Sequence, residues 1–490
     1  MQTVFGARLR HHASNARASP ALAMPGCEVT YAELLGRVQR CSAWLAHERY
    51  LPSEVVGITI ADEIPHLVAS LALLSLGVPH VCLPTHDPVS MRLHLAERLA
   101  VDHVVVVDPQ HALPGRKALL LTPELFESAA SNALPDAFLA DPDAPAIYST
   151  SSGTTGEPKI FALSQHALAW RAGRMAESER IGSRFRALTP VPIEDSIAKN
   201  RRLTSTYLGF TNVFPNGRSS PPSSLRELCA SLHVTCLELS ALQVSSLVLD
   251  AGDPRPLPSH TTVYTAGSTV PARLRQQFKS RFGVPLFIHY GAREFGRITS
   301  TFLGGDDDDV ETVGIPVPWI DLEIVDGDGK ALPPGKIGEV RVRSECMTRE
   351  YYRDPVATSR HLRDGWFYPR DLASLTRGGA LCLHGRADDM MNLNGIKIFP
   401  AEIERVLEEH PAVKAAAAFA KSSATHGDIP VAAVELHASA AVGVDELMAC
   451  ARGRLGVRAP RKIFVLDALP RNAAGKIVKR ELAGLIAPDK

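Results

Sequence analysis

A loop of small hydroxyl residues and glycines, 148–159 with the sequence YSTSSGTTGEPK, restricts the fold of this chain more than any other feature. Its hydroxyl side chains can donate hydrogen bonds to an anion, and they belong to Ser151, Ser152, Thr154 and Thr155. Gly153 and Gly156 let the backbone approach an anion and point N–H groups at it, and Lys159 adds a positive charge. The loop therefore predicts a phosphate site, although a flexible Ser/Gly linker is the alternative for this segment taken alone.

The loop departs from the Walker pattern of nucleotide-binding proteins. That pattern requires a glycine directly before the lysine and a serine or threonine directly after it. Here Pro158 precedes Lys159 and Ile160 follows it. A different nucleotide-binding fold is therefore expected.

Five further segments follow the loop, and together the six resemble the adenylate-forming superfamily of acyl-CoA and aryl-CoA ligases, adenylation domains and luciferases. The five segments are 265–271 (TAGSTVP), 289–296 (HYGAREFG), 365–373 (GWFYPRDLA), 385–404 (GRADDMMNLNGIKIFPAEIE) and 470–482 (PRNAAGKIVKREL). The resemblance covers nearly the whole chain, and six segments in one order are far more specific than any single glycine-rich loop.

The length and the hydrophobic patterns predict an α/β protein of more than one domain. A chain of 490 residues is too long for one ordinary core. Strand-like runs at 55–61, 103–108 and 287–290 are interleaved with helical patterns at 31–48 and 67–77, which favours layered parallel sheets.

The second half of the chain changes character twice. Two alternating runs within 321–344, separated by Gly, Asp and Pro, predict hairpins of a small β-barrel. Beyond this region, helices are expected at 401–410 and 444–456. We therefore expect a large N-terminal domain, 1–386, of layered α/β sheets plus the barrel, followed by a small α+β C-terminal lid domain, 387–490.

Composition excludes several classes of partner. Lys+Arg and Asp+Glu are equal at 53 each, so net charge attracts the chain neither to nucleic acid nor to anionic lipid. The longest apolar run, near 67–76, is far shorter than the roughly 20 residues of a membrane span. The eight cysteines show no C-x-x-C pair and no zinc spacing. A soluble, cytoplasmic protein with reduced cysteines is expected.

The resemblance implies a set of residues for ATP and Mg²⁺. The loop 151–159 would wrap the β- and γ-phosphates, and Glu294 with Thr155 would hold the metal. Oxygen ligands shared with substrate phosphates are what Mg²⁺ favours. An exposed loop acid is the alternative for Glu294.

The same resemblance implies an adenosine site. Tyr290 would stack on adenine, Asp371 would accept the ribose hydroxyls and Arg386 would orient ribose and phosphate. Gly267, Ser268 and Gly291 would lie against the nucleotide, the glycines permitting close backbone approach. A core tyrosine and a structural Asp371–Arg386 salt bridge are the alternatives.

Three C-terminal residues are implied to carry the domain movement of the family. Lys476 would reach the carboxylate and the α-phosphate during adenylation, Asp388 would be the hinge, and Gly395 would line a tunnel for a pantetheine thiol. The alternatives are a solvated lysine, a surface turn acid and an ordinary turn glycine.

The chain also departs from the family pattern. Arg293 stands where the family usually has Thr or Ser before the magnesium glutamate, and Tyr368-Pro369-Arg370-Asp371 replaces R-T-G-D. The segment 190–202 has Glu194 and Asp195 where His or Phe is common. These differences bear on which acid is activated.

The resemblance implies an ATP-dependent, AMP-forming carboxylic acid–CoA ligase, which makes an acyl-adenylate and then a thioester, with ATP, Mg²⁺ and coenzyme A as cofactors. A rival loads an amino or aryl acid onto the phosphopantetheine of a carrier protein. Glu194 or Asp195 could pair with a substrate amine in the rival, whereas Lys199, Arg201 and Arg202 could bind an acidic tail. A degenerate, non-catalytic nucleotide-binding relative is the third possibility.

Overall fold

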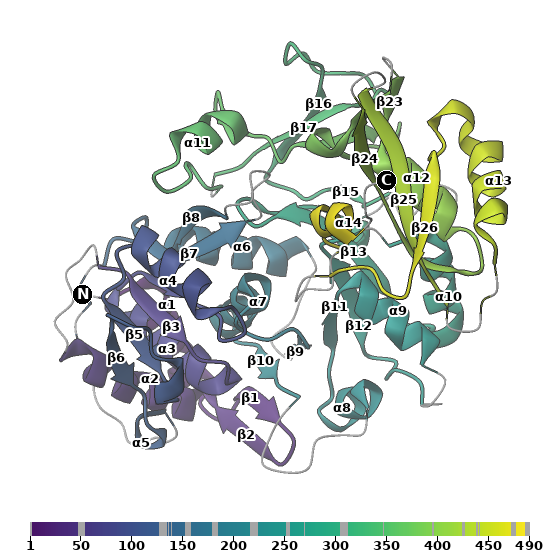
Figure 1. The fold of residues 1–490 in the computed structure, drawn as a ribbon. Helices are drawn as coiled ribbons and strands as arrows, with labels where there is room; N and C mark the ends of the chain where they lie inside the picture. The colour runs from purple at the N-terminus through teal and green to yellow at the C-terminus, as the bar shows by residue number, and fades with distance from the viewer. Residues whose placement is uncertain are drawn as a thin grey trace.

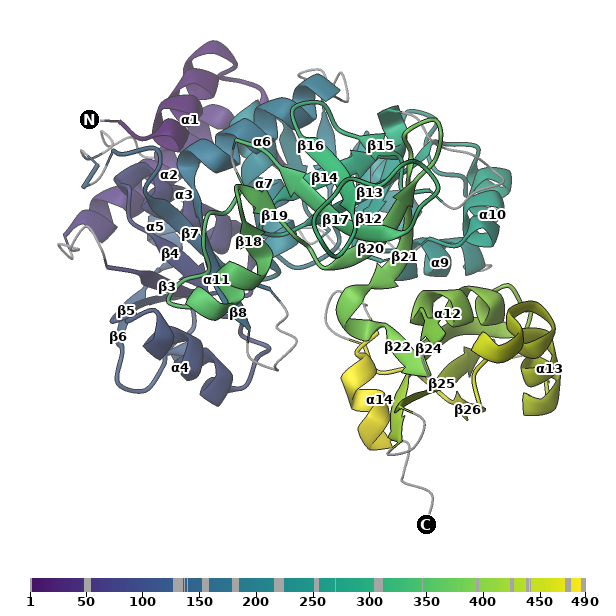
Figure 2. The same ribbon diagram turned by 90° about the horizontal axis from the view of Figure 1, so that it is seen from above.

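The computed structural model describes most of the chain. The described residues are 2–47, 54–126, 135, 137–138, 140–151, 158–178, 185–215, 224–250, 255–268, 270–303, 312–345, 347–393, 396–423, 427–437, 440, 442–471 and 477–485. Figures 1 and 2 show the N-terminal part of the chain as a large body and the C-terminal part as a smaller one beside it.

Two sheets form the N-terminal body. The first has the strand order β6-β5-β3-β4-β7-β8 and is parallel except for the β7–β8 hairpin. Its strands are β3 (Val56–Thr59), β4 (His80–Cys82), β5 (His103–Val106), β6 (Lys117–Leu120), β7 (Pro145–Ser151) and β8 (Lys159–Ser164). The β7–β8 hairpin places Ser151 opposite Lys159, so the phosphate loop joins two paired strands.

The second sheet has nine strands in the order β15-β14-β13-β12-β11-β9-β10-β1-β2. Its strands are β1 (Pro20–Met24), β2 (Cys27–Thr30), β9 (Arg186–Leu188), β10 (Thr211–Val213), β11 (Cys236–Leu239), β12 (Thr262–Ala266), β13 (Leu286–Ala292), β14 (Gly296–Ser300) and β15 (Ile315–Pro316). The strands from β1 to β13 through β10, β9, β11 and β12 pair in parallel, and the edges are antiparallel.

The helices of this body differ in how much of their surface is apolar and buried. The helices of this body are α1 (Val4–Asn15), α2 (Tyr31–Ala46), α3 (Glu63–Leu76), α4 (Val89–Arg98), α5 (Pro123–Phe126), α6 (Gln165–Ser178), α7 (Ser196–Leu208), α8 (Leu225–Ser231), α9 (Ala241–Leu249) and α10 (Ala272–Phe282), with 3₁₀ turns at Pro109–His111 and Thr301–Leu303. α3 is apolar on all sides and buries every residue from Pro65 to Leu76. α2 is amphipathic and begins with a Thr30–Glu33 capping box.

A six-stranded antiparallel sheet follows in the region where the sequence predicted a small β-barrel, and its described strands pair in an open order. Its elements are β16 (Asp321–Val325), β17 (Gly338–Arg343), α11 (Pro355–His361), β18 (Leu362–Arg363), β19 (Trp366–Phe367), β20 (Asp371–Leu375) and β21 (Leu381–Arg386). β16 and β17 form the hairpin expected from the alternating runs.

The C-terminal body is α+β. Its elements are the 3₁₀ turn Ala387–Asp389, β22 (Met391–Leu393), β23 (Ile396–Ile398), α12 (Pro400–Glu408), β24 (Val413–Ser423), β25 (Gly427–Leu436), α13 (Val444–Leu455), the 3₁₀ turn Gly456–Arg458, β26 (Lys462–Leu466) and α14 (Lys479–Leu485). α12 and α13 pack their apolar side chains, among them Ile403 and Leu447, into one core with the strands. In Figure 2 this body lies apart from the N-terminal sheets and is reached through β21.

The predicted fold class is confirmed. The expected helices at 31–48, 67–77, 401–410 and 444–456 correspond to α2, α3, α12 and α13. Among the described residues no helix combines the length and the apolar character needed to cross a membrane.

Candidate active site

The second sheet brings two of the sequence segments together at one edge. Gly267 follows β12 directly, and Tyr290 lies near the end of β13, with Ala266 paired to His289. Because β12 and β13 are parallel, their carboxyl ends meet at the same edge of the sheet. Ligands of open α/β sheets bind at such edges.

A hydrogen-bonded trio closes this edge. The Tyr290 hydroxyl donates to Asp371 Oδ2 at 2.6 Å, and Arg386 Nη1 lies 3.5 Å from Asp371 Oδ1. Asp371 and Arg386 are directly opposed in the β20–β21 pair. Burial and then the Asp371 charge raise the pKa of Tyr290 well above its usual value, so its hydroxyl remains a donor. The salt bridge between Asp371 and Arg386, which was the alternative to a nucleotide role, is present in the structure. Both side chains still lie at the edge of the sheet where the nucleotide site is expected.

The two glycines of this edge have different roles. Gly267 has a φ of +92°, and no atom of the described residues lies within 4 Å of a Cβ built on it, which fits a position open to a ligand. Gly291 is required by the protein itself, because a Cβ there would lie 2.2 Å from the Gly296 carbonyl oxygen across the β13–β14 hairpin. The sequence could not separate these two reasons for a glycine.

Glu294 lies in the turn between β13 and β14 and is buried, with 6% of its surface exposed. The Tyr351 hydroxyl donates to Glu294 Oε1 at 2.8 Å. Arg171 of α6 and the Thr348 amide both donate to the Glu294 main-chain carbonyl, at 2.7 and 3.0 Å. An exposed loop acid would have none of these restraints, so Glu294 is a fixed, buried carboxylate.

Lys159, the last residue of the phosphate segment, lies next to this carboxylate. Its Nζ is 4.9 Å from the centre of the Tyr351 ring and 3.0 Å from His361 Nε2. Burial lowers the pKa of Lys159, and the nearby Glu294 charge opposes that change. Tyr351 thus contacts both the ammonium of Lys159 and the carboxylate of Glu294.

The residues present fit a magnesium nucleotide. One hydrogen bond at Oε1 leaves the Glu294 carboxylate with acceptor capacity, and carboxylate oxygens are preferred Mg²⁺ ligands. Lys159 supplies a positive charge for phosphate oxygens at the same place. A bound Mg²⁺ would neutralise phosphate charge there.

Arg293 connects three elements of the site. Its Nη1 donates to the Thr150 carbonyl at 2.9 Å, at the end of β7, and its Nη2 lies 3.5 Å from Asp195 Oδ2. Asp195 also caps α7 by accepting from the Ile197 amide at 2.7 Å. The arginine that replaces the family hydroxyl therefore positions the phosphate strand against α7.

Glu194 and Asp195, the acidic residues directly before α7, already have hydrogen-bond or ion-pair partners within the protein. Glu194 is buried and accepts from the Thr85 amide at 2.6 Å and from the Thr85 hydroxyl at 3.0 Å. Asp195 is held by Arg293 and by the helix amide. Each carboxylate oxygen of Glu194 thus has a donor within the protein, the Thr85 amide at Oε1 and the Thr85 hydroxyl at Oε2, which argues against its pairing with a substrate amine.

The basic residues of α7 are also turned to the interior. Arg201 pairs with Glu238, and Arg202 lies 3.0 Å from Glu63 while stacking on the Phe214 ring. Lys199 is 2% exposed and has no hydrogen-bond partner among the described residues. Burial lowers the pKa of Lys199 to about 8. The structure gives Arg201 and Arg202 partners of their own, which argues against their binding an acidic tail.

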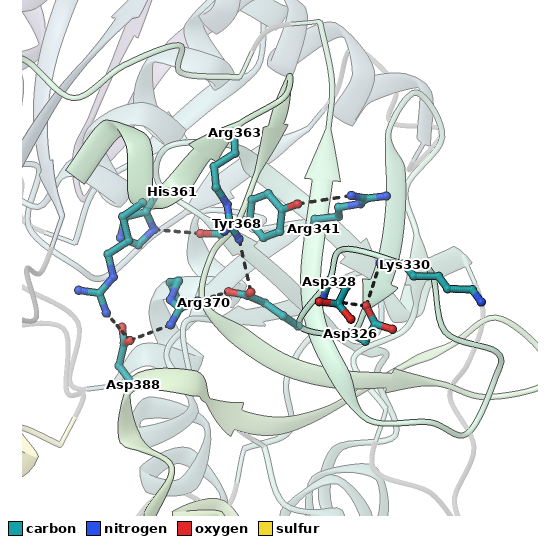
Figure 3. Close-up of polar contacts among 11 residues, drawn as sticks. Asp326, Asp328, Lys330, Arg341, His361, Arg363, Tyr368, Arg370 and Asp388 are labelled. Atoms are coloured by element: carbon teal, nitrogen blue, oxygen red, sulfur yellow. Dashed lines mark hydrogen bonds and ion pairs between the residues drawn. The ribbon is translucent and has the colours of Figure 1, made fainter. Parts of the chain in front are cut away.

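Asp388, the predicted hinge, is held by two arginines (Figure 3). Its Oδ1 lies 2.6 Å from Arg360 Nη2 and 3.3 Å from Arg370 Nη2. Arg370 is in turn paired with Glu339 of β17. Burial alone would raise the pKa of Asp388, but the charges of Arg370 and Arg360 lower it. This cluster fixes the first turn after β21.

Arg370 stands at a backbone position that suits glycine. Its φ is +68°, in the left-handed region that costs an L-residue about 1–2 kcal/mol. The family pattern R-T-G-D has its glycine at this position. The Arg370 side chain offsets part of this cost through its pairs with Glu339 and Asp388.

Some predicted site residues lie outside the described part of the chain. They are Ser152, Gly153, Thr154, Thr155, Gly156, Gly395 and Lys476. Their flanks are described: Ser151 pairs with Lys159, and Arg471 bridges to Ile477 around the Lys476 segment. Ser268 follows Gly267 at the edge of the second sheet.

Sequence reasoning missed three residues of the site. Arg171, Tyr351 and His361 contact the predicted residues, yet none lies in the six segments. His361 is 202 positions from Lys159. A single sequence contains no signal that predicts contacts between residues so far apart in the chain.

A cavity of about 570 Å³ lies elsewhere, on the six-stranded sheet. Its lining residues are Trp319, Ile320, Asp321, Arg343, Ser344 and Glu345. None of the predicted nucleotide residues that the structure describes is among these lining residues.

The buried carboxylate, the lysine and the tyrosine–aspartate pair at a parallel sheet edge define a nucleotide-binding enzyme of the α/β class. The chain belongs to the AMP-binding enzyme family. Residues 9–352 match the model of the AMP-binding enzyme, and residues 402–476 match that of the AMP-binding enzyme C-terminal domain.

Similar proteins include several ligases. An indoleacetate–CoA ligase of Aromatoleum aromaticum is 29% identical over 71% of this chain and 68% of its own length. A feruloyl-CoA synthase of Amycolatopsis is 27% identical over 95% of this chain and 96% of its own. The solved O-succinylbenzoate coenzyme A synthetase of Bacillus subtilis, in complex with AMP, is 25% identical, covers 97% of each chain and has a TM-score of 0.85.

These findings confirm the predicted superfamily and the enzyme class, an AMP-forming acid–thiol ligase. They also bear out ATP, Mg²⁺ and coenzyme A as the cofactors, since a solved relative carries ATP and a magnesium ion. The roles of the individual site residues remain predictions.

The strain at residue 370 can be measured with two variants. Arg370→Gly and Arg370→Ala remove the same ion pairs, but only glycine relieves the positive φ. We expect Arg370→Gly to be more stable to urea than Arg370→Ala by about 1 kcal/mol. Equal stabilities would show that the backbone at this position relaxes without cost.

Proposed function

We propose that this ligase activates an aryl or arylalkanoic acid without a second charged group and transfers the acyl group to coenzyme A. The carboxylate oxygen attacks the α-phosphorus of ATP, and the bond to pyrophosphate breaks. The coenzyme A thiolate then attacks the acyl carbon, and AMP leaves. The observation that carries the proposal is the grouping of Lys159, Tyr351 and Glu294 at the end of the phosphate strand.

The charge pattern of α7 supports the acid class. Recognition of an amino acid needs an available carboxylate, and Glu194 and Asp195 are both engaged within the protein. Recognition of a dicarboxylic acid needs available cations, and Arg201 and Arg202 are paired. Relatives named for indoleacetate, feruloyl and 4-chlorobenzoate agree with an uncharged aromatic tail. Relatives named for 2-succinylbenzoate agree with the aromatic class but not with the absence of a second charge, since that acid has two carboxylates.

The residue roles belong to the same proposal. Glu294 with Thr155 holds Mg²⁺, and the loop Ser151 to Lys159 holds the β- and γ-phosphates. Tyr290, Asp371 and Arg386 bind the adenosine, with the backbone of Gly267, Ser268 and Gly291 close to it. The trio formed by Tyr290, Asp371 and Arg386 supports this assignment, because it presents an aromatic ring, a carboxylate and a cation at one edge.

The C-terminal body acts as the lid in this proposal, with its boundary after Arg386. A change of sheet supports that boundary, since β21 ends at Arg386 in one sheet and β22 begins at Met391 in another. Lys476 serves adenylation, and after rotation about Asp388 the segment with Gly395 faces the thiol.

Acid-dependent exchange of labelled pyrophosphate into ATP tests the activity and the acid class. We expect exchange with aryl and arylalkanoic acids, and thioester formation when coenzyme A is added. Exchange with amino acids alone would favour the carrier-protein rival. Exchange with dicarboxylic acids alone, lost in Lys199→Met, would assign Lys199 to an acidic tail. No exchange with any acid while ATP still binds would favour the non-catalytic relative.

The role of Lys476 separates the two half-reactions. Lys476→Ala should slow adenylation by about 10²-fold or more, because a charge that stabilises the transition state is lost. Thioester formation from supplied acyl-adenylate should continue. Lys479→Ala is the matched control, since Lys479 is three residues away and pairs with Glu404. Equal losses in both half-reactions of Lys476→Ala would reject a role confined to adenylation.

The hinge can be tested at Asp388 with two variants. Asp388→Pro fixes φ near −65°, whereas Asp388→Ala removes the same carboxylate and leaves the backbone free. We expect Asp388→Pro to retain one half-reaction and lose the other, and Asp388→Ala to retain both. A proline variant that completes the full reaction at the wild-type rate would show that residue 388 is not the pivot.

A further inference from the structure

Lys159 has an unusual partner for a partly buried lysine in a candidate nucleotide site. Its Nζ lies 3.0 Å from Nε2 of His361, the last residue of α11. The side chain of His361 is fixed from its other side as well, because Nδ1 lies 2.9 Å from the Tyr368 main-chain carbonyl (Figure 3). The Tyr368 amide donates in return to the His361 carbonyl at 2.7 Å.

These two contacts determine the proton positions on the ring. A carbonyl oxygen only accepts, so Nδ1 carries the hydrogen that is donated to Tyr368. A lysine ammonium only donates, so Nε2 must present its lone pair to Lys159. His361 is therefore neutral, and burial followed by the Lys159 charge keeps its pKa below the usual value.

Aromatic packing holds this neutral ring in place. His361 is 4% exposed, with the Tyr351 ring edge-on at 5.6 Å and the Phe367 ring stacked at 6.4 Å. Tyr351 also lies under Lys159 and donates to Glu294. One aromatic residue thus contacts both the lysine, through its ring, and the carboxylate, through its hydroxyl.

The charges that act on Lys159 come from several elements. They are Glu294 from the β13–β14 turn, Arg386 of β21, Asp388 of the following turn and Arg360 of α11. Among the described residues, no carboxylate lies within ion-pair distance of Lys159. A neutral acceptor therefore directs the ammonium without cancelling its charge.

We propose that His361 is a positioning residue for ATP: it accepts one hydrogen of the Lys159 ammonium and directs the other two at the phosphates, leaving the full positive charge for them. A carboxylate at this position would orient the lysine equally well and remove its charge. This inference rests on the proposed function, since it deepens the role of Lys159 at the same site.

Three variants at His361 separate orientation from charge. His361→Gln keeps an acceptor of similar reach without a charge, His361→Ala removes the acceptor, and His361→Glu keeps an acceptor but adds a negative charge. We expect the KM for ATP in pyrophosphate exchange to rise about tenfold in His361→Ala, the size of one charge-assisted hydrogen bond. The KM for ATP of His361→Gln should lie within about threefold of the wild-type value, and that of His361→Glu should exceed the KM of the alanine variant. The kcat at saturating ATP should change less than KM in each variant.

His384→Gln is the matched control. His384 is also partly buried in the N-terminal body, but its Nε2 is bonded to Ser374 Oγ at 2.9 Å, away from Lys159. Its KM for ATP should equal that of the wild type. Circular dichroism and thermal melting establish that each variant is folded before it is assayed.

Direct calorimetric binding of MgATP, measured without any acid, keeps this inference distinct from the proposed function. If wild-type protein binds ATP but no acid supports exchange, the function fails while the order of affinities still tests His361. A folded His361→Ala variant with wild-type ATP affinity would overturn the inference. So would a His361→Glu variant that binds ATP as well as His361→Gln.

Discussion

The hydrogen bond from the Tyr351 hydroxyl to Glu294 organises the candidate active site. It joins a residue close to α11 with the turn between β13 and β14, and it gives a buried carboxylate a partner without neutralising it. The Lys159 ammonium lies over the same tyrosine ring, 4.9 Å from its centre. Opposite charges are thereby kept near each other and still available, which a site for a magnesium nucleotide requires. Burial and the Glu294 charge raise the pKa of the Tyr351 hydroxyl, so it stays a donor.

Around this contact, charged groups are arranged in two different ways. Most of those in α7 and directly before it are paired inside the protein: Glu194 with Thr85, Arg202 with Glu63, and Asp195 with Arg293. Lys199 is the exception among the described residues of this region, because its buried ammonium has no hydrogen-bond partner among them. Those at the sheet edge and in the turn after β21 are paired with one another and lie closer to the surface. The charged groups near α7 therefore contribute to the packing beside the site. Those at the sheet edge and after β21 are accessible to a ligand and can change partners when the C-terminal body moves.

Much of the fold followed from the sequence. Helical patterns in the sequence identified α2, α3, α12 and α13, and two alternating runs separated by Gly, Asp and Pro identified the β16–β17 hairpin. The motif order also led to Lys159, Tyr290, Glu294, Asp371 and Arg386, and the structure brings Lys159 close to Glu294 and Tyr290 close to Asp371 and Arg386. Local patterns suffice here because each motif lies at the end of a strand, where chain order and sheet order together fix its place.

The sequence by itself determined the class of the protein, its α/β layers and the residue types that meet phosphate and ribose. Only the tertiary structure decided which charges are available. Glu194 and Arg202 looked free in the sequence and are buried against partners more than 100 positions away. Gly291 is a glycine because a hairpin partner approaches it, and Arg370 adopts a glycine conformation because Glu339 and Asp388 hold its side chain. The Lys159–His361 contact likewise spans 202 positions. Such pairings depend on packing between segments that are distant in the sequence, so a local sequence pattern cannot predict them.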